Sequence, residues 1–434
     1  MSKELSEIFN FSEITDDCVK CGKCIPVCTI HQINPDEVTS PRGFIELLGQ
    51  YQNGDLELDK NAKDIFESCF LCTNCVDVCP NSLPTDMVIE EVRADIADKF
   101  GIATFKRVFF WLLRHRFAMD MFSKMGYVFK GCMLKSDDKD RGLFARFNLP
   151  FIKKGRLLPS MAFTSFLNSH KEHIPAKDSK QKVAIFIGCL GNYNYTNIGS
   201  SLLYILEKLN VEVFIPKKQL CCGAPAYFTG DMSSVEYMTT KNIEYFESFM
   251  SDYDAMIIPE ATCSSMIKHD WERFFANHKM PEWEERAKKL SGKIFMATEW
   301  LHSQTNLQDM LAKEGKNIDE LVTYHDPCHA RKTQDIYTQP RELLSQNYNM
   351  IEMSDPNRCC GFGGVTMQTE KFKFAKLAGT PKASMIRDTK ASIVSAECSA
   401  CRVQISESLN DANVETIFKN PIELIAQALG KDEK

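Results

Sequence analysis

Two kinds of apolar pattern alternate along the second part of the chain. Short apolar runs of strand length recur, and segments with the spacing of amphipathic helices separate them. Because strands that alternate with helices form layered domains, residues 183–430 predict an α/β domain with a mainly parallel sheet. The strand candidates are Val183–Cys189, Val211–Pro216, Ala255–Glu260, Leu321–His325, Ile351–Ser354, Ala391–Glu397 and Val414–Phe418.

The first 100 residues show no such alternation and predict a helical region. A helix is expected to open at 84–86, because apolar residues then recur at helical spacing, at Met87, Val88, Val92 and Ile96. Residues 101–180 predict a helical connector that ends in a polar, lysine-rich linker at 169–182. Its aromatic and basic stretch, Phe105–Arg116, is compatible with a membrane interface or with a helix packed between domains. We favour packing, because six apolar residues in a row cover all sides of a helix.

Composition and charge narrow the class of protein. The chain has 434 residues, of which 44% are apolar, and a net charge of −6, so no nucleic-acid partner is indicated. Residues 1–14 show no signal-peptide pattern, and the longest relevant apolar stretch, Val108–Leu113, is too short to span a membrane. We therefore expect a cytoplasmic protein, with a peripheral place on the inner face of the membrane as the alternative.

Eight of the eighteen cysteines form two copies of one spacing, C-x2-C-x2-C-x3-C. This spacing is typical of paired iron–sulfur clusters, in which the fourth cysteine of each run ligates the other cluster. The first predicted [4Fe-4S] cluster is held by Cys18, Cys21, Cys24 and Cys79, and the second by Cys69, Cys72, Cys75 and Cys28. Zinc would favour pairs of C-x2-C, and disulfides need an oxidising compartment, so both alternatives are weaker. Two adjacent clusters indicate electron transfer.

The remaining cysteines reveal an internal repeat in residues 183–430. Each copy has a single cysteine, then a Cys-Cys-Gly triplet, then a further cysteine, which a second one follows three residues later in the second copy. The single and the further cysteine of each copy follow predicted strands, where open α/β sheets place ligands. The first copy contains Cys189, Cys221, Cys222 and Cys263, and the second contains Cys328, Cys359, Cys360, Cys398 and Cys401.

The two copies differ in their thiol content. The second offers five thiolates and predicts a metal cluster, whereas Met266 stands where the first would have its fifth ligand. The first copy therefore either binds metal with four thiolates or only packs its thiols. His325, Asp326 and His329 flank Cys328. They predict either groups around the metal ligands or a proton path, or else only a turn at the end of a strand. Cys132 is expected to be an ordinary thiol.

The predicted architecture is an α/β protein with a helical, two-cluster ferredoxin-like domain followed by two repeated α/β cysteine-rich lobes. The expected boundaries are 1–100 for the ferredoxin-like domain, 101–180 for the connector, 181–310 for the first lobe and 311–434 for the second lobe.

The duplicated Cys-Cys-Gly motif resembles the cysteine-rich (CCG) domain of heterodisulfide reductases. Together with two ferredoxin runs, it is similar to the iron–sulfur subunits of glycolate oxidase and of the lactate-utilisation system. The segment Ser40–Gly43 adds to the glycolate oxidase likeness, and the stretches 221–227, 325–329 and 359–364 look closer to the lactate-utilisation subunit. The resemblance implies a subunit that takes electrons from a flavin-containing dehydrogenase and delivers them toward a quinone or another membrane acceptor.

Three functions follow from these observations. The first is an electron-transfer subunit of a 2-hydroxyacid oxidoreductase; no flavin is expected in this chain, because no G-x-G-x-x-G follows a predicted strand. The second is reduction of a disulfide at the second cysteine-rich lobe, where the resemblance implies a non-cubane iron–sulfur cluster. The third is a structural module with zinc in these lobes.

Overall fold

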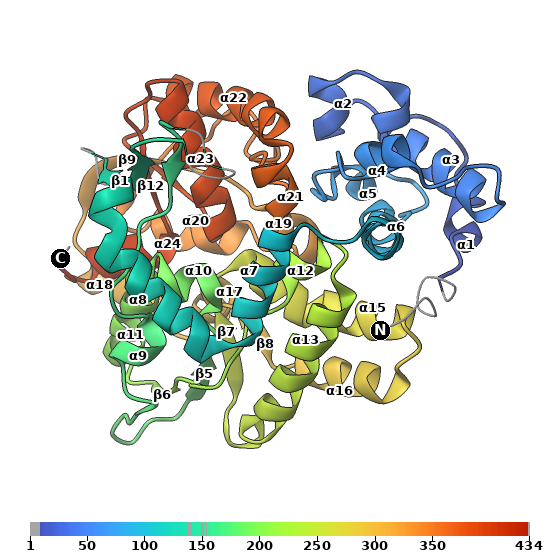
Figure 1. The fold of residues 1–434 in the computed structure, drawn as a ribbon. Coiled ribbons are helices and arrows are strands. Elements are labelled where there is room, and N and C mark those ends of the chain that lie inside the picture. Colours follow the sequence, from blue (N-terminus) through green and yellow to red (C-terminus); the bar gives the residue numbers. More distant parts are fainter. Residues whose placement is uncertain (1–8, 138–140, 149–151, 153, 433–434) are drawn as a thin grey trace.

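The computed structural model describes residues 9–137, 141–148, 152 and 154–432. A helical N-terminal region lies beside two α/β lobes, which pack against each other (Figure 1). The N-terminal helices are α1 (Ser12–Thr15), α2 (Thr29–Ile33), the 3-10 turn η1 (Glu37–Thr39), α3 (Pro41–Gln52), α4 (Lys60–Phe66), α5 (Asn74–Asp77) and α6 (Thr85–Phe100).

Two of these helices begin where the sequence supplies a capping side chain. Ser40 Oγ accepts a hydrogen bond from Gly43 N at 3.0 Å at the start of α3, and Asp59 does the same for Ala62 N at 2.7 Å in α4. The predicted helix after residue 84 is confirmed as α6. Its apolar residues Val88 and Val92 are fully buried in the core of this region.

The connector contains more than helices. The helices α7 (Thr104–Arg114), α8 (Arg116–Met133) and α9 (Phe166–Ser169) share it with a small antiparallel sheet of β1 (Leu134–Ser136), β2 (Leu143–Ala145) and β3 (Leu157–Leu158). The strands are two or three residues long, too short for an alternating pattern to reveal them. β3 lies against the second lobe, where Leu157 N donates to Glu407 Oε2 at 2.7 Å.

The first lobe has a five-stranded sheet in the order β4-β6-β5-β7-β8. It is parallel except at β4, which pairs antiparallel with β6. The strands are β4 (His173–Ile174), β5 (Lys182–Ile185), β6 (Glu212–Phe214), β7 (Ala255–Ile258) and β8 (Ile294–Met296). The helical elements are α10 (Gly188–Tyr193), α11 (Thr196–Lys208), α12 (Ala224–Tyr227), α13 (Met232–Glu247), η2 (Met250–Asp252), α14 (Ala261–Ser265), the π-helix η3 (Met266–Asp270), α15 (Trp271–Asn277), α16 (Pro281–Ser291), α17 (Ala297–Gln304) and α18 (Leu307–Glu314).

The second lobe has a four-stranded parallel sheet in the order β10-β9-β11-β12. Its strands are β9 (Ile318–Tyr324), β10 (Tyr348–Met350), β11 (Ile393–Ser395) and β12 (Ile417–Lys419). Its helices are α19 (Cys328–Gln334), α20 (Thr338–Leu344), α21 (Gly364–Thr369), α22 (Phe372–Thr389), α23 (Ser399–Asp411) and α24 (Pro421–Ala428). The two sheets share one buried core that joins Val183 and Ile257 to Val322 and Ile425.

The strand predictions are confirmed except at one segment. Ile351–Ser354 is not a strand; the strand β10 ends at Met350, just before it. The apolar pattern does not mark the end of this strand, because apolar residues continue past the point where pairing with β9 stops. The last hydrogen bond between the two segments runs from Ile351 N to Val322 O at 2.9 Å. Strands β1 to β4 and β8 have no counterpart among the predicted strands. No helix among the described residues is both long and apolar enough to cross a membrane.

Candidate iron–sulfur and cysteine-rich sites

The structure gathers the cysteines of the ferredoxin runs into two groups, each drawn from both runs. Cys18, Cys21 and Cys24 line one small cavity together with Cys79. A curled backbone turns this loop around the cavity, with left-handed residues at Lys20 (φ 52°) and Gly22 (φ 79°). These are the four residues predicted for the first cluster.

The second group lies directly beside the first. Cys28, Cys69, Cys72 and Cys75 line a neighbouring cavity, and Cys75 borders both cavities. Leu71 N donates to Cys69 Sγ at 3.4 Å, and Thr29 Oγ1 lies 3.4 Å from Cys72 Sγ. An all-thiol donor set with hydrogen bonds to sulfur fits a [4Fe-4S] cluster. Burial raises the pKa of Cys69 to about 12, so bound iron would have to favour the thiolate form.

In the first lobe, the cysteines follow strand ends as predicted. Cys189 lies in α10 after β5, and Cys263 lies in α14 after β7. The thiol of Cys189 interacts with that of Cys221, and the thiol of Cys222 interacts with that of Cys263. Met266, at the position of the missing fifth thiol, is fully buried.

The five cysteines of the second lobe also meet. Cys360 Sγ lies 3.4 Å from Cys401 Sγ, Cys398 Sγ accepts from Cys401 N at 3.4 Å, and Cys328 begins α19. Cys359 Sγ accepts from the backbone of Gly361, also at 3.4 Å.

Gly361, the glycine of the triplet, has a left-handed conformation with φ +90°. A Cβ atom there would lie 2.9 Å from Ala378 Cβ, so only glycine lets the loop pack this closely.

Both lobes open onto one cavity of about 200 Å³ between them. Buried Glu260 also borders this cavity. The thiols that line it are those of Cys189, Cys222, Cys263, Cys328, Cys359, Cys360, Cys398 and Cys401. The repeat therefore brings thiols of both lobes to one shared, mainly apolar space.

Two buried carboxyl groups join the lobes reciprocally. Glu260, after β7, accepts from Ser399 N of the second lobe at 2.8 Å. Glu397, after β11, accepts from Thr298 N of α17 at 3.2 Å. Both carboxyls are fully buried, and desolvation raises the pKa of Glu260 to about 7 and that of Glu397 to about 8. The pairing is a finding of the structure, since the sequence pattern points only to the cysteines beside these residues.

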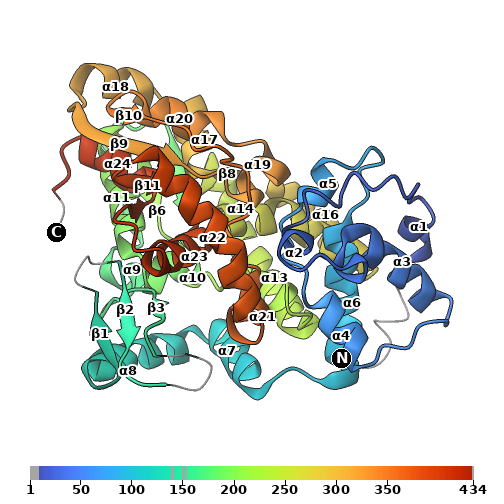
Figure 2. The same ribbon diagram turned by 90° about the horizontal axis from the view of Figure 1, so that it is seen from above.

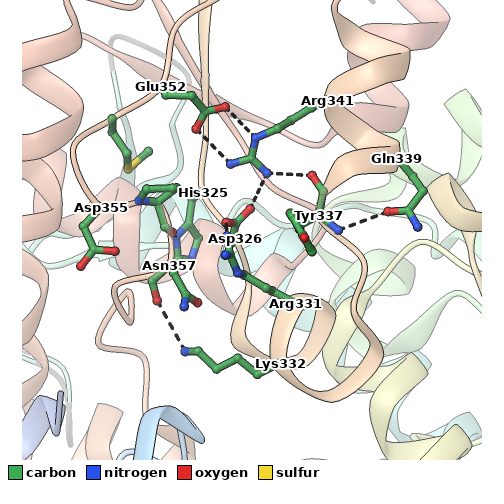
Figure 3. A network of polar contacts seen from close by, with 12 residues as sticks. His325, Asp326, Arg331, Lys332, Tyr337, Gln339, Arg341, Glu352, Asp355 and Asn357 are labelled. Carbon is green, nitrogen blue, oxygen red and sulfur yellow. Dashed lines mark hydrogen bonds and ion pairs between the residues drawn. The ribbon is translucent and has the colours of Figure 1, made fainter. Parts of the chain in front are cut away.

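His325 offers a nitrogen ligand for a metal, although the sequence does not identify this residue as a direct ligand. Its ring lies within 4.8 Å of the sulfur atoms of Cys360 and Cys401. Nδ1 is 3.1 Å from the carbonyl oxygen of Pro356, which can only accept, so Nδ1 carries the hydrogen. Nε2 is buried without a hydrogen-bond partner and keeps its lone pair. Figure 3 shows His325 beside Asp355 and Asn357.

Asp326 serves a structural role next to this ring. Its carboxylate is fully buried and pairs with Arg331 Nη1 at 2.5 Å and Arg341 Nη1 at 2.6 Å, and Arg341 continues to Glu352 (Figure 3). Its charge is thus neutralised within the network. His329 contacts different residues: its Nδ1 lies 3.5 Å from Cys328 Sγ, and its ring stacks on Phe228.

A contact between distant parts of the chain links the ferredoxin-like region to the second lobe. The thiol of Cys72 interacts with the thiol of Cys359. Lys332 of α19 supports this junction, since its ammonium donates to Cys72 O at 3.2 Å and to the side chain of Asn74. Cys75 and Cys72 line the same cavity and Cys72 interacts with Cys359, so the three thiols form a series from the ferredoxin-like region to the second lobe. Cys132, expected to be an ordinary thiol, lies apart and is exposed on α8.

Comparison with known families agrees with this arrangement. The 4Fe-4S dicluster domain matches residues 14–83, and the Cysteine-rich domain (CCG) matches residues 183–268 and 322–406. The chain belongs to the CCG iron–sulfur proteins. Its dicluster domain implies two [4Fe-4S] clusters.

Individual relatives of this CCG protein are distant. A probable glycolate oxidase iron–sulfur subunit of Bacillus subtilis is 26% identical, over 93% of this chain and 92% of its own. One of the subunits of the fumarate reductase (CoM/CoB) of Methanothermobacter marburgensis is 26% identical, over 96% and 72%. Lactate utilization protein A of Geobacillus thermodenitrificans is 29% identical, over 50% and 87%.

A solved structure shares the fold. The crystal structure of a hypothetical protein from Helicobacter pylori aligns with a TM-score of 0.55 and 11% identity, over 100% of this chain and 74% of that one. At this identity the likeness concerns the fold alone.

Proposed function

We propose that this protein is the iron–sulfur electron-transfer subunit of a 2-hydroxyacid oxidoreductase of the glycolate or lactate type. In this proposal a flavin-containing dehydrogenase supplies the electrons, and a quinone or another carrier accepts them. The likeness to a probable glycolate oxidase iron–sulfur subunit along nearly the whole chain supports it. The protein would act in the cytoplasm or at the inner face of the membrane.

The observation that carries the proposal is the connected series of thiol groups. Cys75 borders both ferredoxin cavities, and the Cys72 thiol interacts with that of Cys359 in the second lobe. Iron–sulfur clusters supply one-electron transfer when bound. The chain's own part is to hold the sulfur atoms in adjacent positions, with Cys72 and Cys359 buried at the junction.

The proposed ligand sets are those of the sequence analysis. The first [4Fe-4S] cluster takes Cys18, Cys21, Cys24 and Cys79, and the second takes Cys69, Cys72, Cys75 and Cys28. A further iron–sulfur cluster belongs to the second lobe, with Cys328, Cys359, Cys360, Cys398 and Cys401. The four thiols of the first lobe, Cys189, Cys221, Cys222 and Cys263, form a poorer site because Met266 is neutral.

Anaerobic purification from the native organism, with associated proteins retained, tests the proposal. We expect a flavoprotein in the complex, and we expect glycolate or lactate to bleach the iron–sulfur absorbance, whereas acetate, which lacks the hydroxyl group, leaves it unchanged. A complex without flavin, or one that no 2-hydroxyacid bleaches, would overturn it.

Disulfide reduction is the second candidate, favoured by the mainly apolar cavity between the lobes. Two electrons and two protons would convert one disulfide into two thiols there. Chemically reduced protein and a small disulfide such as cystamine provide the assay. If disulfide reduction is the function, thiols are released and Cys360→Ser abolishes the release while both ferredoxin-type paramagnetic resonance signals remain.

A further inference from the structure

Helix α8 presents an unusually apolar face to solvent. Phe117 is 83% exposed and Val128 is 65% exposed, although both are large hydrophobic residues. Such a contiguous face is uncommon on proteins that have no binding partner there. The exposed apolar residues of the helix are Phe117, Met121, Phe122, Met125, Val128, Phe129 and Met133.

The opposite face of α8 fixes the orientation of this helix. Asp120 accepts from Tyr193 OH at 2.8 Å and from Asn168 Nδ2 at 2.9 Å, and Ser123 is buried. Gly126 lies so close to Met161 that a Cβ atom would come within 2.8 Å of Met161 Cε. The exposed residues are separated by one, three or four positions, so they share one side of the helix. The apolar face therefore points outward because polar contacts hold the other side.

The segment around this face is basic, in contrast to the acidic chain. Residues 104–136 contain a single acidic residue, Asp120, which faces the protein. The whole chain has a net charge of −6. Of its basic residues, Arg107, Lys124 and Lys135 are exposed, whereas Lys106 is buried in an ion pair with Glu370 and Arg116 pairs with Asp120.

The preceding helix, α7, also carries partly exposed apolar residues. In α7, Phe110 and Leu113 pack into the core of the first lobe, which confirms the packing interpretation for that stretch. Val108 and Trp111 remain about half exposed, at 53% and 49%. Both helices run along one edge of the molecule (Figure 2). Tryptophan and basic residues beside an apolar helix face are typical of membrane interfaces.

We propose that α8 docks the protein onto an anionic lipid bilayer, with its apolar face in the interfacial layer and its lysines at the headgroups. The helix of 18 residues is about 27 Å long and would lie in the membrane plane. A second copy of the chain fits less well, since pairing two such faces would bring their basic residues together. This inference does not depend on the proposed electron-transfer role.

Docking in this way would bring the first cysteine-rich lobe toward the bilayer. Leu113 and Arg116, at the junction of α7 and α8, line the same small cavity as Cys189 and Cys221. The thiols of the first lobe are therefore the ones next to the docking helix.

Vesicle sedimentation with the full-length, anaerobically purified protein tests the proposal. We expect binding to phosphatidylcholine vesicles that contain phosphatidylglycerol, and weaker binding in high salt or to phosphatidylcholine alone. The triple variant Phe117→Gln, Val128→Gln, Phe129→Gln should lose at least tenfold in binding. The matched control Val38→Gln, Leu377→Gln, which removes exposed apolar groups elsewhere, should bind like the unmodified protein.

Two outcomes would overturn the inference. One is equal sedimentation of the triple variant and the unmodified protein, or no sedimentation of either, with folding verified by circular dichroism. The other is a lipid-free dimer, seen by light scattering, that the triple variant converts to a monomer, because the face would then be a protein interface.

The charge variant Lys124→Glu, Lys130→Glu should lose binding to anionic vesicles while its fold is retained.

Discussion

At the scale of single residues, Arg93 has the most extensive set of backbone contacts near the clusters. Its guanidinium donates to Phe228 O at 2.8 Å, Phe66 O at 3.1 Å and Cys69 O at 2.8 Å. One side chain thereby joins α4, the second cysteine loop and the first lobe. The planar fork of arginine makes this possible, and the single ammonium of lysine cannot reach all three acceptors in the same way.

Replacing Arg93 with lysine should therefore destabilise the protein and loosen the Cys69 loop. We expect the free energy of unfolding to fall by about 2–3 kcal/mol, because buried carbonyl groups lose their donors. Denaturant unfolding measures this, and Arg286→Lys, in the exposed pair with Glu247, is the control. The paramagnetic resonance signal of the second ferredoxin site should change more than that of the first. Equal stability of the two variants would contradict the role of Arg93.

His325 leads to a second expectation at this scale. Phe186 occupies the equivalent position of the first lobe, so His325→Phe imitates a residue that the fold already accepts. Because Nε2 of His325 keeps a lone pair near Cys360 and Cys401, we expect a nitrogen coupling in pulsed paramagnetic resonance of the second-lobe metal site. His325→Phe should remove this coupling, and His329→Gln should retain it. The reverse result would assign the nitrogen to His329.

At the scale of elements, helix α6 is exceptional because it buries charged side chains. Glu91 accepts from Asn277 of the first lobe at 2.8 Å, and Asp95 accepts from Tyr51 of α3 at 3.0 Å. Desolvation raises the pKa of each carboxyl to about 7. Both carboxyls are therefore costly to ionise, and Glu91 is the one that joins the helix to the first lobe.

The raised pKa of Glu91 makes stability depend on pH. Between its ordinary pKa of 4.5 and about 7, the folded state holds the proton that the unfolded state has lost, so stability falls as pH rises. From pH 5.5 to pH 8, we expect the free energy of unfolding of the unmodified protein to fall by about 2 kcal/mol relative to that of Glu91→Gln. Denaturant unfolding at the two values tests this, with exposed Asp55→Asn as control. No change in the difference between Glu91→Gln and the unmodified protein would contradict the assignment.

The sequence predicts the elements whose signals are local. The strands β5, β7, β9 and β11 have clear apolar runs, and cysteines just beyond their ends follow from the geometry of parallel sheets. The grouping of Cys28 with the second run follows from spacing alone. The strands β1 to β3 and the reciprocal pairing of Glu260 and Glu397 depend on contacts between distant segments. The exposed face of α8 is also hidden, because periodicity shows that a helix has an apolar side without showing where that side points.

At the scale of the whole molecule, the ferredoxin-like region and both lobes form one connected body. The shared core of the two sheets, the two buried carboxyls and the Arg93 contacts each join parts that the sequence alone presents as separate. The predicted domain boundaries remain useful as a description of the chain. They do not predict independently stable pieces, so experiments on this protein require the full chain.

Metal analysis of the full chain distinguishes the iron–sulfur and zinc alternatives for the second lobe. We expect more iron and sulfide than two [4Fe-4S] clusters contain, and Cys360→Ser should lower both toward the content of two clusters. Cys132→Ser, at an exposed cysteine far from the sites, should leave the content unchanged. If zinc accompanies iron and sulfide at the level of two clusters, the lobes bind zinc and the third cluster is absent.

The contact between Cys72 and Cys359 also bears on how the protein matures. The loop with Cys72 leaves the ribosome long before the loop with Cys359, so its buried surroundings are complete only after the second lobe has folded and docked. Iron inserted early at that site would face oxygen and solvent during synthesis. Cofactor delivery to the second ferredoxin site is therefore best timed after translation ends, and an aerobic host should produce chains deficient in that cluster first.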